Sequence, residues 1–248
     1  GWFDAWVARN LPTDLTAVVG YEIGARRTFR KAKKLGITTI LDAPSFHHEW
    51  QDAFYEPVET DAVHKQINAR KTAEIQLADH ILVVSELARK SYLEAGVPRE
   101  KVTAIPRGAD LSYFQPSQHE HEAVESPFTF IFAGHAGRRK GVDILLSASE
   151  HLSCSVGLDH KIHFAGGYDK TLFKDARAPF KLLGYLDRPK LTKAFQRADC
   201  LVLPSRHDSF GRVVVEAMAT GLPVLLSENV GAKQIIEEGK TGWTVPTG

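Results

Sequence analysis

Cysteine is scarce in this chain of 248 residues, which contains only Cys154 and Cys200. The two are far apart, and neither belongs to a C-x-x-C pair or to a cluster of cysteine and histidine. A zinc site or a disulfide scaffold needs several such residues at short spacing, so we expect neither. The scarcity fits a reducing, cytoplasmic setting better than a secreted one.

A charge excess and a long apolar run are also absent. The 31 Lys and Arg residues nearly balance the 30 Asp and Glu residues, and the net charge of +1 argues against a nucleic-acid partner. No apolar run approaches the roughly 20 residues that cross a bilayer as a helix. The opening residues, Gly1 to Asp4, lack the basic-then-apolar order of a signal peptide. We therefore expect the chain to be soluble.

What the chain does contain is a regular alternation of short apolar runs and helical stretches. This rhythm is typical of βαβ units, so we expect an α/β fold with parallel sheets. The expected strands form two sets, at residues 17–19, 39–41, 80–84 and 102–105, and at residues 128–132, 162–165, 180–183, 200–203 and 223–226. Two sets predict two Rossmann-like domains, each built on its own sheet.

The stretch between the two sets has neither a helical nor a strand period. Residues 115–127 contain prolines, histidines and acidic residues, a composition that favours a linker. We accordingly place a partial first domain at residues 1–112, an interdomain linker at 113–127 and a second domain at 128–248.

The loop after residues 128–132 combines glycines with cations. It contains Gly134, Gly137, Arg138, Arg139 and Lys140, and a helical stretch follows. Backbone amides and the helix dipole attract an anion at such a turn, and Arg and Lys side chains can then hold it, so the loop is a candidate phosphate site. The pattern is neither G-x-G-x-x-G nor a Walker A loop. A solvated basic turn explains the same residues equally well.

Two acids follow the run at 200–203, Asp208 before a predicted helix and Glu216 within it. Their positions differ by eight, about two helical turns, so both can face one crevice at the carboxyl ends of the strands. One carboxylate could accept hydrogen bonds from ribose hydroxyls and the other from a sugar. In the alternative interpretation, Asp208 only caps the helix and Glu216 is a solvated helix residue.

These elements occur in an order that resembles glycosyltransferase family 4, whose members have the GT-B fold. The resemblance covers about residues 15–248. Its segments are LADHILVVSE at 77–86, IPRGAD at 105–110, RRKGVD at 138–143, DSFGRVVVE at 208–216 and EGKTGWTVP at 238–246. The segment at 208–216 resembles the family's motif of two acids separated by seven residues. The resemblance implies two Rossmann-like domains whose parallel sheets face a central cleft.

A retaining glycosyltransferase is the activity that the resemblance implies. Such an enzyme moves a sugar from a nucleoside-diphosphate-sugar donor to a hydroxyl of a carbohydrate or lipid-linked acceptor, without a metal or a cofactor. Lys140, with Arg138 or Arg139, would neutralise the leaving diphosphate. Glu216 would hold the ribose, and Asp208 would contact the transferred sugar. The other implied donor-binding residues are Gly134, Gly137, Ser209, Phe210, Gly211 and, near the base, Tyr185.

Two further features lie in the first half. His47 and His48 occupy positions where related sequences can carry a histidine that faces the donor sugar. On an extended chain, adjacent side chains point in opposite directions, so at most one of the two would face the site, and a surface histidine is the alternative. The cations between Arg26 and Lys34 recur at helical spacing. A solvated helix face explains them, and a peripheral membrane contact is the other interpretation.

Departures from the family pattern bear on these expectations. Asp208 replaces a usual Glu, which puts its reach to the sugar in doubt, and His135 replaces a common Arg, which moves the phosphate contacts to residues 138–140. Arg107 replaces a common Asn. The family's opening strand with its glycine-rich loop and its closing helices have no counterpart, so we expect a chain truncated at both ends, with weak donor binding or no activity by itself.

Two other functions remain open at this point. The truncation and the shorter Asp208 fit a catalytically silent nucleotide-sugar-binding fragment. The fold also fits another GT-B enzyme, such as a sugar-nucleotide epimerase or a phosphorylase, although no lysine context for a pyridoxal cofactor is recognisable.

Overall fold

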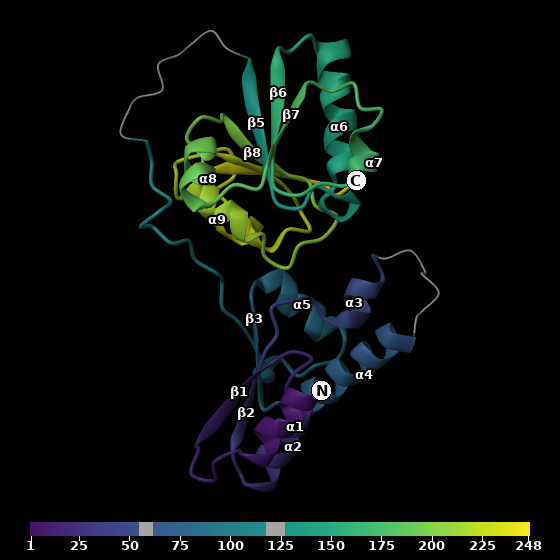
Figure 1. Cartoon of the computed structure of the whole chain (residues 1–248), viewed down its shortest axis with the longest axis vertical. Helices are drawn as coiled ribbons and strands as arrows, with labels where there is room; N and C mark the ends of the chain where they lie inside the picture. Colours follow the sequence, from purple (N-terminus) through teal and green to yellow (C-terminus); the bar gives the residue numbers. More distant parts are fainter. Residues whose placement is uncertain (55–61, 118–126) are drawn as a thin grey trace. The chain divides into compact units, whose positions relative to one another are not determined.

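The computed structural model describes residues 1–54, 62–117 and 127–248. Contacts divide the chain into two compact units, Gly1–Pro106 and Arg107–Gly248, each with its own parallel sheet (Figure 1). The expected α/β fold with two Rossmann-like sheets is therefore confirmed. Within the described residues, no helix is long and apolar enough to span a membrane.

The first unit contains a four-stranded sheet in the order β1-β2-β3-β4. Its strands are β1 (Ala17–Tyr21), β2 (Thr38–Asp42), β3 (His80–Val83) and β4 (Val102–Ala104), and its helices are α1 (Trp2–Arg9), α2 (Arg26–Lys34), α3 (His48–Asp52), α4 (Ala62–Leu77), α5 (Glu86–Glu94) and η1 (Arg99–Lys101). The strand order runs in one direction and such crossovers are right-handed, so α2, α4 and α5 cover the same face. Phe29, Ile81 and Tyr92 are buried between that face and the helices.

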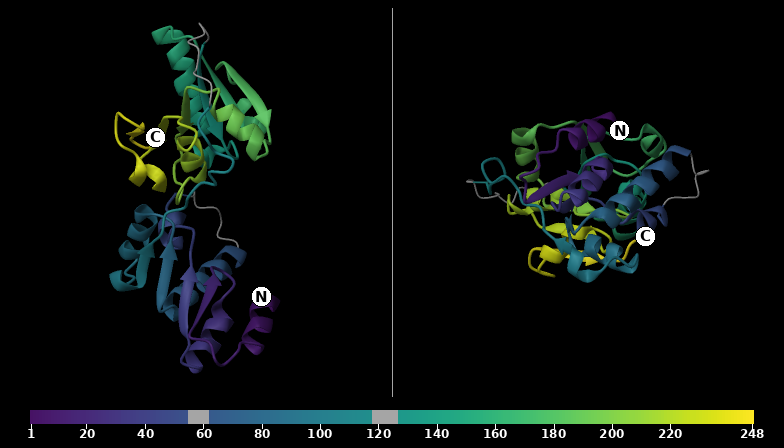
Figure 2. Two further views of the ribbon diagram at one scale, coloured as in Figure 1. Left: turned by 90° about the vertical axis from the view of Figure 1, so that its left-hand side faces the viewer. Right: turned by 90° about the horizontal axis from the view of Figure 1, so that it is seen from below.

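The second unit contains a six-stranded parallel sheet in the order β10-β9-β8-β5-β6-β7. Its strands are β5 (Phe128–Ala133), β6 (His160–Ala165), β7 (Phe180–Gly184), β8 (Cys200–Leu203), β9 (Val224–Ser227) and β10 (Gly242–Val245). Its helices are η2 (Arg138–Lys140), α6 (Val142–His151), η3 (Leu152–Val156), α7 (Lys170–Phe173), α8 (Arg188–Phe195), α9 (Arg212–Met218) and η4 (Gly231–Ile235). Figure 2 gives two further views of both units.

The winding direction of the second sheet reverses between β5 and β8. The chain winds outward from β5 to β7, returns to pair β8 with β5, and then winds the other way to β10. In doubly wound sheets, ligands bind outside the carboxyl ends of the strands at such a reversal. The loops after β5 and β8 flank this point, so both candidate motifs lie at the same edge of one sheet.

The strand predictions and the structure agree closely, with one addition. Each of the nine expected strands corresponds to an observed strand to within two residues at its ends. The sequence does not predict β10 as a strand. Trp243 and Val245 of β10 are exposed on the edge of the sheet, so the segment has no continuous apolar run.

The boundary between the units lies earlier than the predicted linker. Phe114 is only 1% exposed, and its ring packs against that of Phe195 in α8 with 6.3 Å between centroids. The hydroxyl of Thr192 also donates a hydrogen bond of 3.1 Å to the carbonyl of Tyr113. The start of the predicted linker is thus part of the second unit, because one buried aromatic ring fixes it there. The rest of the linker prediction, residues 118–126, lies outside the described residues.

Candidate functional site

A cavity of about 500 Å³ lies at the strand reversal of the second unit. The loops after β5, β6, β7 and β8 contribute to its walls, together with α8, α9 and Phe114. Its polar and charged lining residues are Lys140, Tyr185, Arg188, Asp208, Arg212 and Glu216, and its glycines are Gly134, Gly166 and Gly211. The loop after β5, which is the candidate phosphate site, and the motif at 208–216 therefore line one cavity.

Lys140 reaches this cavity because the loop after β5 turns tightly against the end of β8. Gly141 closes the short helix η2 with a φ of 69°, in the left-handed region that favours glycine. A Cβ atom at this position would lie 1.9 Å from the carbonyl oxygen of Pro204. No other residue type fits between the two loops, and the contact brings Lys140 next to the residues that follow β8.

Asp208 forms an ion pair with Lys140 inside the cavity. The side chains of Lys140 and Asp208 are only 15% and 13% exposed. Backbone hydrogen bonds of 2.9 Å from Asp208 to Asn229 and from Gly231 to Asp208 fix the position of this loop. Gly211 occupies the N-cap of α9, so the interpretation of Asp208 as the helix cap is wrong.

Glu216 faces the same cavity from α9. Its side chain is largely buried and forms an ion pair of 3.0 Å with the Nε of Arg212, one turn earlier in the helix. Burial raises the pKa of Glu216, and the charge of Arg212 opposes this shift. The interpretation of Glu216 as a solvated helix residue is therefore wrong. The two acids of the motif line one cavity from a loop and from a helix.

Lys140 is the one cation of the 138–140 run that lines the cavity. The Arg138 side chain is 76% exposed and lies 3.6 Å from a carboxylate oxygen of Asp143. Arg139 donates a hydrogen bond of 3.3 Å to the carbonyl of His207. Neither arginine belongs to the cavity wall in this structure.

Arg206 joins the two loops, a role that the sequence reasoning missed. Its guanidinium donates two hydrogen bonds of 2.8 Å to the carboxylate of Asp143, in the first turn of α6. The Nη1 atom also donates to the carbonyl of Arg138 at 2.5 Å, and the Arg206 amide donates to the carbonyl of Arg139 at 3.0 Å. The hydrogen bonds from the Arg206 guanidinium to the Asp143 carboxylate lower the pKa of Asp143. The phosphate-loop candidate and the Asp208 loop are therefore held together.

The remaining predicted donor-binding residues have different environments. Tyr185 is 88% exposed and lines the cavity with Gly134 and Gly211. Phe210 is buried in the core, and the cavity wall does not include Gly137, Ser209 or Phe210. Arg188 and Arg212 line the cavity without having been predicted. The signal for Arg212 was its position four residues before Glu216, a spacing at which opposite charges meet on a helix.

His207 is a buried neighbour of the Asp208 loop. Desolvation lowers the pKa of its imidazole from 6.5 to about 4, and the charge of Arg139 acts in the same direction. The ring is therefore neutral near pH 7 while the loops on either side of it carry ionised groups.

His47 and His48 belong to a separate cavity, of about 390 Å³, in the first unit. The expectation that at most one of them faces a site assumed an extended chain, but α3 begins at His48. Both rings are buried, line this cavity and lie 4.3 Å apart between centroids. Burial lowers the pKa of His47 to about 4 and also lowers that of His48. The walls of the cavity come from the start of α3, from α4, from the loop after α5 and from η1.

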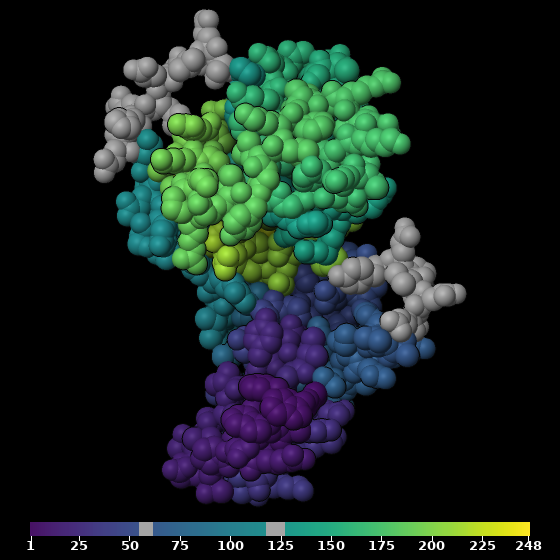
Figure 3. All heavy atoms as spheres, in the orientation of Figure 1, coloured from purple at the N-terminus to yellow at the C-terminus, as the bar shows by residue number. Residues whose placement is uncertain are grey.

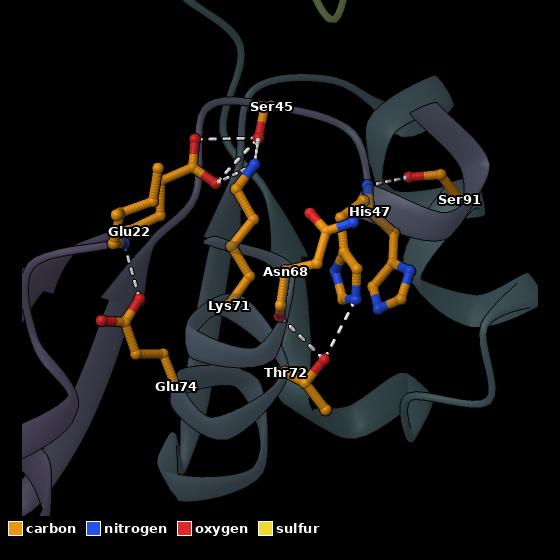
Figure 4. Close-up of polar contacts among 10 residues, drawn as sticks. Glu22, Ser45, His47, Asn68, Lys71, Thr72, Glu74 and Ser91 are labelled. Atoms are coloured by element: carbon orange, nitrogen blue, oxygen red, sulfur yellow. Dashed lines mark hydrogen bonds and ion pairs between the residues drawn. The ribbon is translucent and has the colours of Figure 1, made fainter. Parts of the chain in front are cut away.

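A buried polar cluster at the carboxyl edge of the first sheet was not predicted. Lys71 of α4 lies 3.3 Å from the carboxylate of Glu22, after β1, and the Ser45 hydroxyl lies 2.8 Å from both Glu22 oxygens. Figure 4 shows Glu22, Ser45 and the end of Lys71 meeting, while the side chain of Thr72, the next residue of α4, lies apart from them. A Thr72 hydroxyl contact of 3.0 Å with His48 Nε2 links the helix to the histidine pair. The cluster ties the strand ends to α4.

A metal centre is not apparent in the described part of the chain. Within residues 1–54, 62–117 and 127–248, no group of three or more His, Cys, Asp or Glu side chains could hold a metal ion. Metal independence remains a prediction.

Comparison with known proteins gives a consistent result. Residues 114–248 match the family described as "Glycosyl transferases group 1". The chain is 28% identical over 209 residues to D-inositol 3-phosphate glycosyltransferase of Nocardia farcinica, a match that covers 77% of this chain and 45% of that protein. It is 30% identical over 180 residues to GDP-mannose-dependent alpha-mannosyltransferase of Mycobacterium tuberculosis, covering 70% and 45%.

A solved structure shares the fold over nearly the whole chain. The Anabaena protein HepE, in complex with UDP and glucose, has a TM-score of 0.71 and 16% sequence identity, and the match covers 98% of this chain and 67% of that one. This likeness confirms the GT-B fold that the sequence resemblance implied. The chain spans about half the length of the curated relatives it matches.

Proposed function

The chain belongs to the glycosyl transferases group 1 family, and on that premise we propose that it takes part in a retaining sugar transfer. The donor is a nucleoside-diphosphate sugar, and the acceptor is a hydroxyl of a carbohydrate or a lipid-linked carbohydrate. One observation carries the proposal. A single cavity at the strand reversal brings together Lys140, Asp208 and Glu216, a cation and two carboxylates with the chemistry that a diphosphate and two sets of sugar hydroxyls require.

The diphosphate is proposed to bind at Lys140. Lys140 directly precedes Gly141, the N-cap of α6, and the dipole of that helix also favours an anion near its start. In the transfer, the acceptor oxygen forms a bond to the anomeric carbon while the bond from that carbon to the diphosphate breaks on the same face. The acceptor proton passes to the leaving diphosphate oxygen. Lys140 stabilises the negative charge that develops there.

The two carboxylates are proposed to have different partners. Glu216 is fixed in α9 beside Arg212 and accepts hydrogen bonds from the ribose hydroxyls, which donor and product share. Asp208 contacts hydroxyls of the transferred sugar. Neither acid is assigned as a nucleophile. Tyr185, which is exposed at the cavity, provides an aromatic face for the base.

The experiment that tests this function measures release of nucleoside diphosphate, with and without an acceptor, over a panel of donors. The names of similar proteins mention UDP and GDP-mannose, so the panel includes uridine and guanosine donors. Release that depends on acceptor supports transfer. Donor binding without release supports the silent nucleotide-sugar-binding fragment. Conversion of the donor to an epimer supports a sugar-nucleotide epimerase.

We also propose that the first unit contacts membrane surfaces, where lipid-linked acceptors are found. Trp2, Phe3 and Trp6 of α1 are exposed, and Figure 3 shows this helix, in dark purple, on the surface. Asp4 accepts hydrogen bonds from the amides at the start of α2 and so holds α1 beside the cations of that helix. Exposed aromatic rings next to cations are typical of a surface that binds anionic lipid. Cosedimentation with vesicles that contain or lack phosphatidylserine tests this, and binding to neither kind contradicts it.

A further inference from the structure

The Lys140 ammonium already has a partner inside the candidate donor site. Asp208 forms an ion pair with it, and both side chains are mostly buried in the wall of the same cavity. A diphosphate bound at Lys140 has to share or replace this carboxylate. The following inference rests on the proposed function, because it concerns how a diphosphate and a sugar use that site.

The pairing is a fixed feature of the loops. Arg206 holds the loop after β5 through the Asp143 carboxylate and the Arg138 and Arg139 carbonyls. The Asp208 backbone is bonded to Asn229 and Gly231, and its Oδ1 accepts a hydrogen bond of 3.3 Å from the Phe210 amide. Oδ2 then faces Lys140. These contacts hold the two loops together, so the two charges face each other when no ligand is bound.

We propose that Asp208 is the internal counter-ion of Lys140 and thereby sets the preference of the site for the intact donor over the free nucleoside diphosphate. When a phosphate replaces Asp208 as the ion-pair partner of Lys140, the mostly buried Asp208 carboxylate loses its counter-charge. A buried charge without a partner is unfavourable. The sugar hydroxyls of the intact donor can donate hydrogen bonds to it. A nucleoside diphosphate has no group at that position and leaves Asp208 without a replacement partner.

A counter-ion role predicts a different effect of Asp208→Asn on diphosphate affinity than a contact with the sugar alone would. If Asp208 met only the transferred sugar, its replacement by Asn would leave the affinity for a nucleoside diphosphate unchanged. As counter-ion of Lys140, Asp208 competes with the diphosphate. Asp208→Asn removes the competing charge and keeps the shape of the side chain, so it strengthens diphosphate binding while it weakens the contact to the sugar.

Calorimetry on the whole chain tests the inference with inorganic pyrophosphate, UDP and GDP as probes. We expect Asp208→Asn to bind pyrophosphate and the preferred nucleotide about tenfold more tightly than the unchanged chain. The reason is that the Asp208 carboxylate no longer competes with the phosphate for Lys140. Glu237→Gln is the matched control, because it removes one carboxylate from an exposed ion pair with Lys240 in the same unit. An equal gain in the control assigns the effect to net charge and overturns the inference.

A double-mutant cycle isolates the pair. Lys140→Ala removes the phosphate partner, so the gain from Asp208→Asn should vanish when both substitutions are combined. Thermal unfolding of each variant is measured to check that the second unit remains folded. Unchanged or weaker diphosphate binding by Asp208→Asn overturns the inference and leaves the proposed function standing. Failure of every probe to bind the unchanged chain and Asp208→Asn overturns both.

Discussion

At the scale of single residues, Lys140 has the clearest predicted effect on ligand binding. It is the mostly buried cation of the loop after β5 and lines the cavity, whereas Lys190 is exposed on α8 in an ion pair of 3.4 Å with Asp187. A mostly buried charge-assisted contact contributes about 1.5 to 3 kcal/mol, so Lys140→Ala should weaken nucleoside-diphosphate binding roughly 10- to 100-fold. Lys190→Ala should change it less than about threefold. Equal losses in calorimetry contradict the assignment of Lys140.

His207 gives a pH dependence that unfolding can measure. Its pKa is lowered from 6.5 to about 4 by burial, so between these values the unfolded chain binds a proton that the folded chain does not. Stability of the second unit should therefore fall as pH falls from about 6.5 to 4, by roughly 3 kcal/mol at most.

His207→Gln should flatten that part of the pH profile in urea denaturation. His151→Gln is the control, because His151 is exposed at the end of α6. The same slope in the His207 variant and the unchanged chain would show that this imidazole does not titrate differently on folding.

The residue types of the site were predictable, but their partners were not. Lys140, Asp208 and Glu216 follow strand ends and carry the right charges, which a linear pattern can reveal. The sequence does not reveal that Asp208 pairs with Lys140 across 68 positions, or that Arg206 binds Asp143 across 63. Such partners depend on how two loops meet after the sheet has formed. The roles of the predicted residues with ligand remain proposals.

At the scale of elements, the turn at Gly141 determines where the loop after β5 lies. Gly141→Ala places a Cβ atom against the Pro204 carbonyl, in a backbone conformation that by itself costs about 1 to 2 kcal/mol for a residue other than glycine. We expect a larger loss of unfolding free energy than this, together with weaker diphosphate binding.

Gly157 provides the matched comparison for Gly141. Its φ is 68°, nearly the same, but no atom lies within 4 Å of the position that a Cβ would occupy. Gly157→Ala should cost only about 1 to 2 kcal/mol, from the backbone conformation itself, and leave ligand affinity unchanged. Urea denaturation of both variants measures the loss of unfolding free energy, and calorimetry measures the change in diphosphate affinity. Similar behaviour of the two would show that the contact with Pro204 is unimportant.

Elements with continuous apolar runs were the easiest to predict. Strands buried on both faces, such as β5 and β8, carry a run of apolar residues that is visible in the sequence. The edge strand β10 alternates between exposed and buried residues over only four positions, which is too short for a reliable period. The sheet order, and with it the reversal between β5 and β8, comes from tertiary pairing.

At the scale of the whole molecule, Phe114 anchors the first residues of the second unit to α8. Phe114→Ala should lower the unfolding free energy of that unit by about 3 to 5 kcal/mol, because it removes a buried ring. Tyr113→Ala is the neighbouring control. Its ring is partly exposed and contacts the Arg188 guanidinium at 5.4 Å, so we expect a loss of about 1 kcal/mol or less.

Chemical denaturation of both variants, with near-ultraviolet circular dichroism as the probe, measures the difference. Similar small losses for Phe114→Ala and Tyr113→Ala would indicate that residues 113–117 behave as a linker, as the sequence composition suggests. The composition of this segment could not reveal that Phe114 is buried in the second unit, because a single apolar residue in a polar segment forms no periodic pattern.

The attachment of the loop after β5 to the loop after β8 has a practical consequence for redesign. Gly141 lies against Pro204, and Arg206 binds the backbone of residues 138 and 139. If only residues 134–141 are replaced by those of a relative, the new loop meets residues 204–208 of this chain, to which it is not matched. Libraries intended to change donor preference should therefore exchange both segments together, as one cassette.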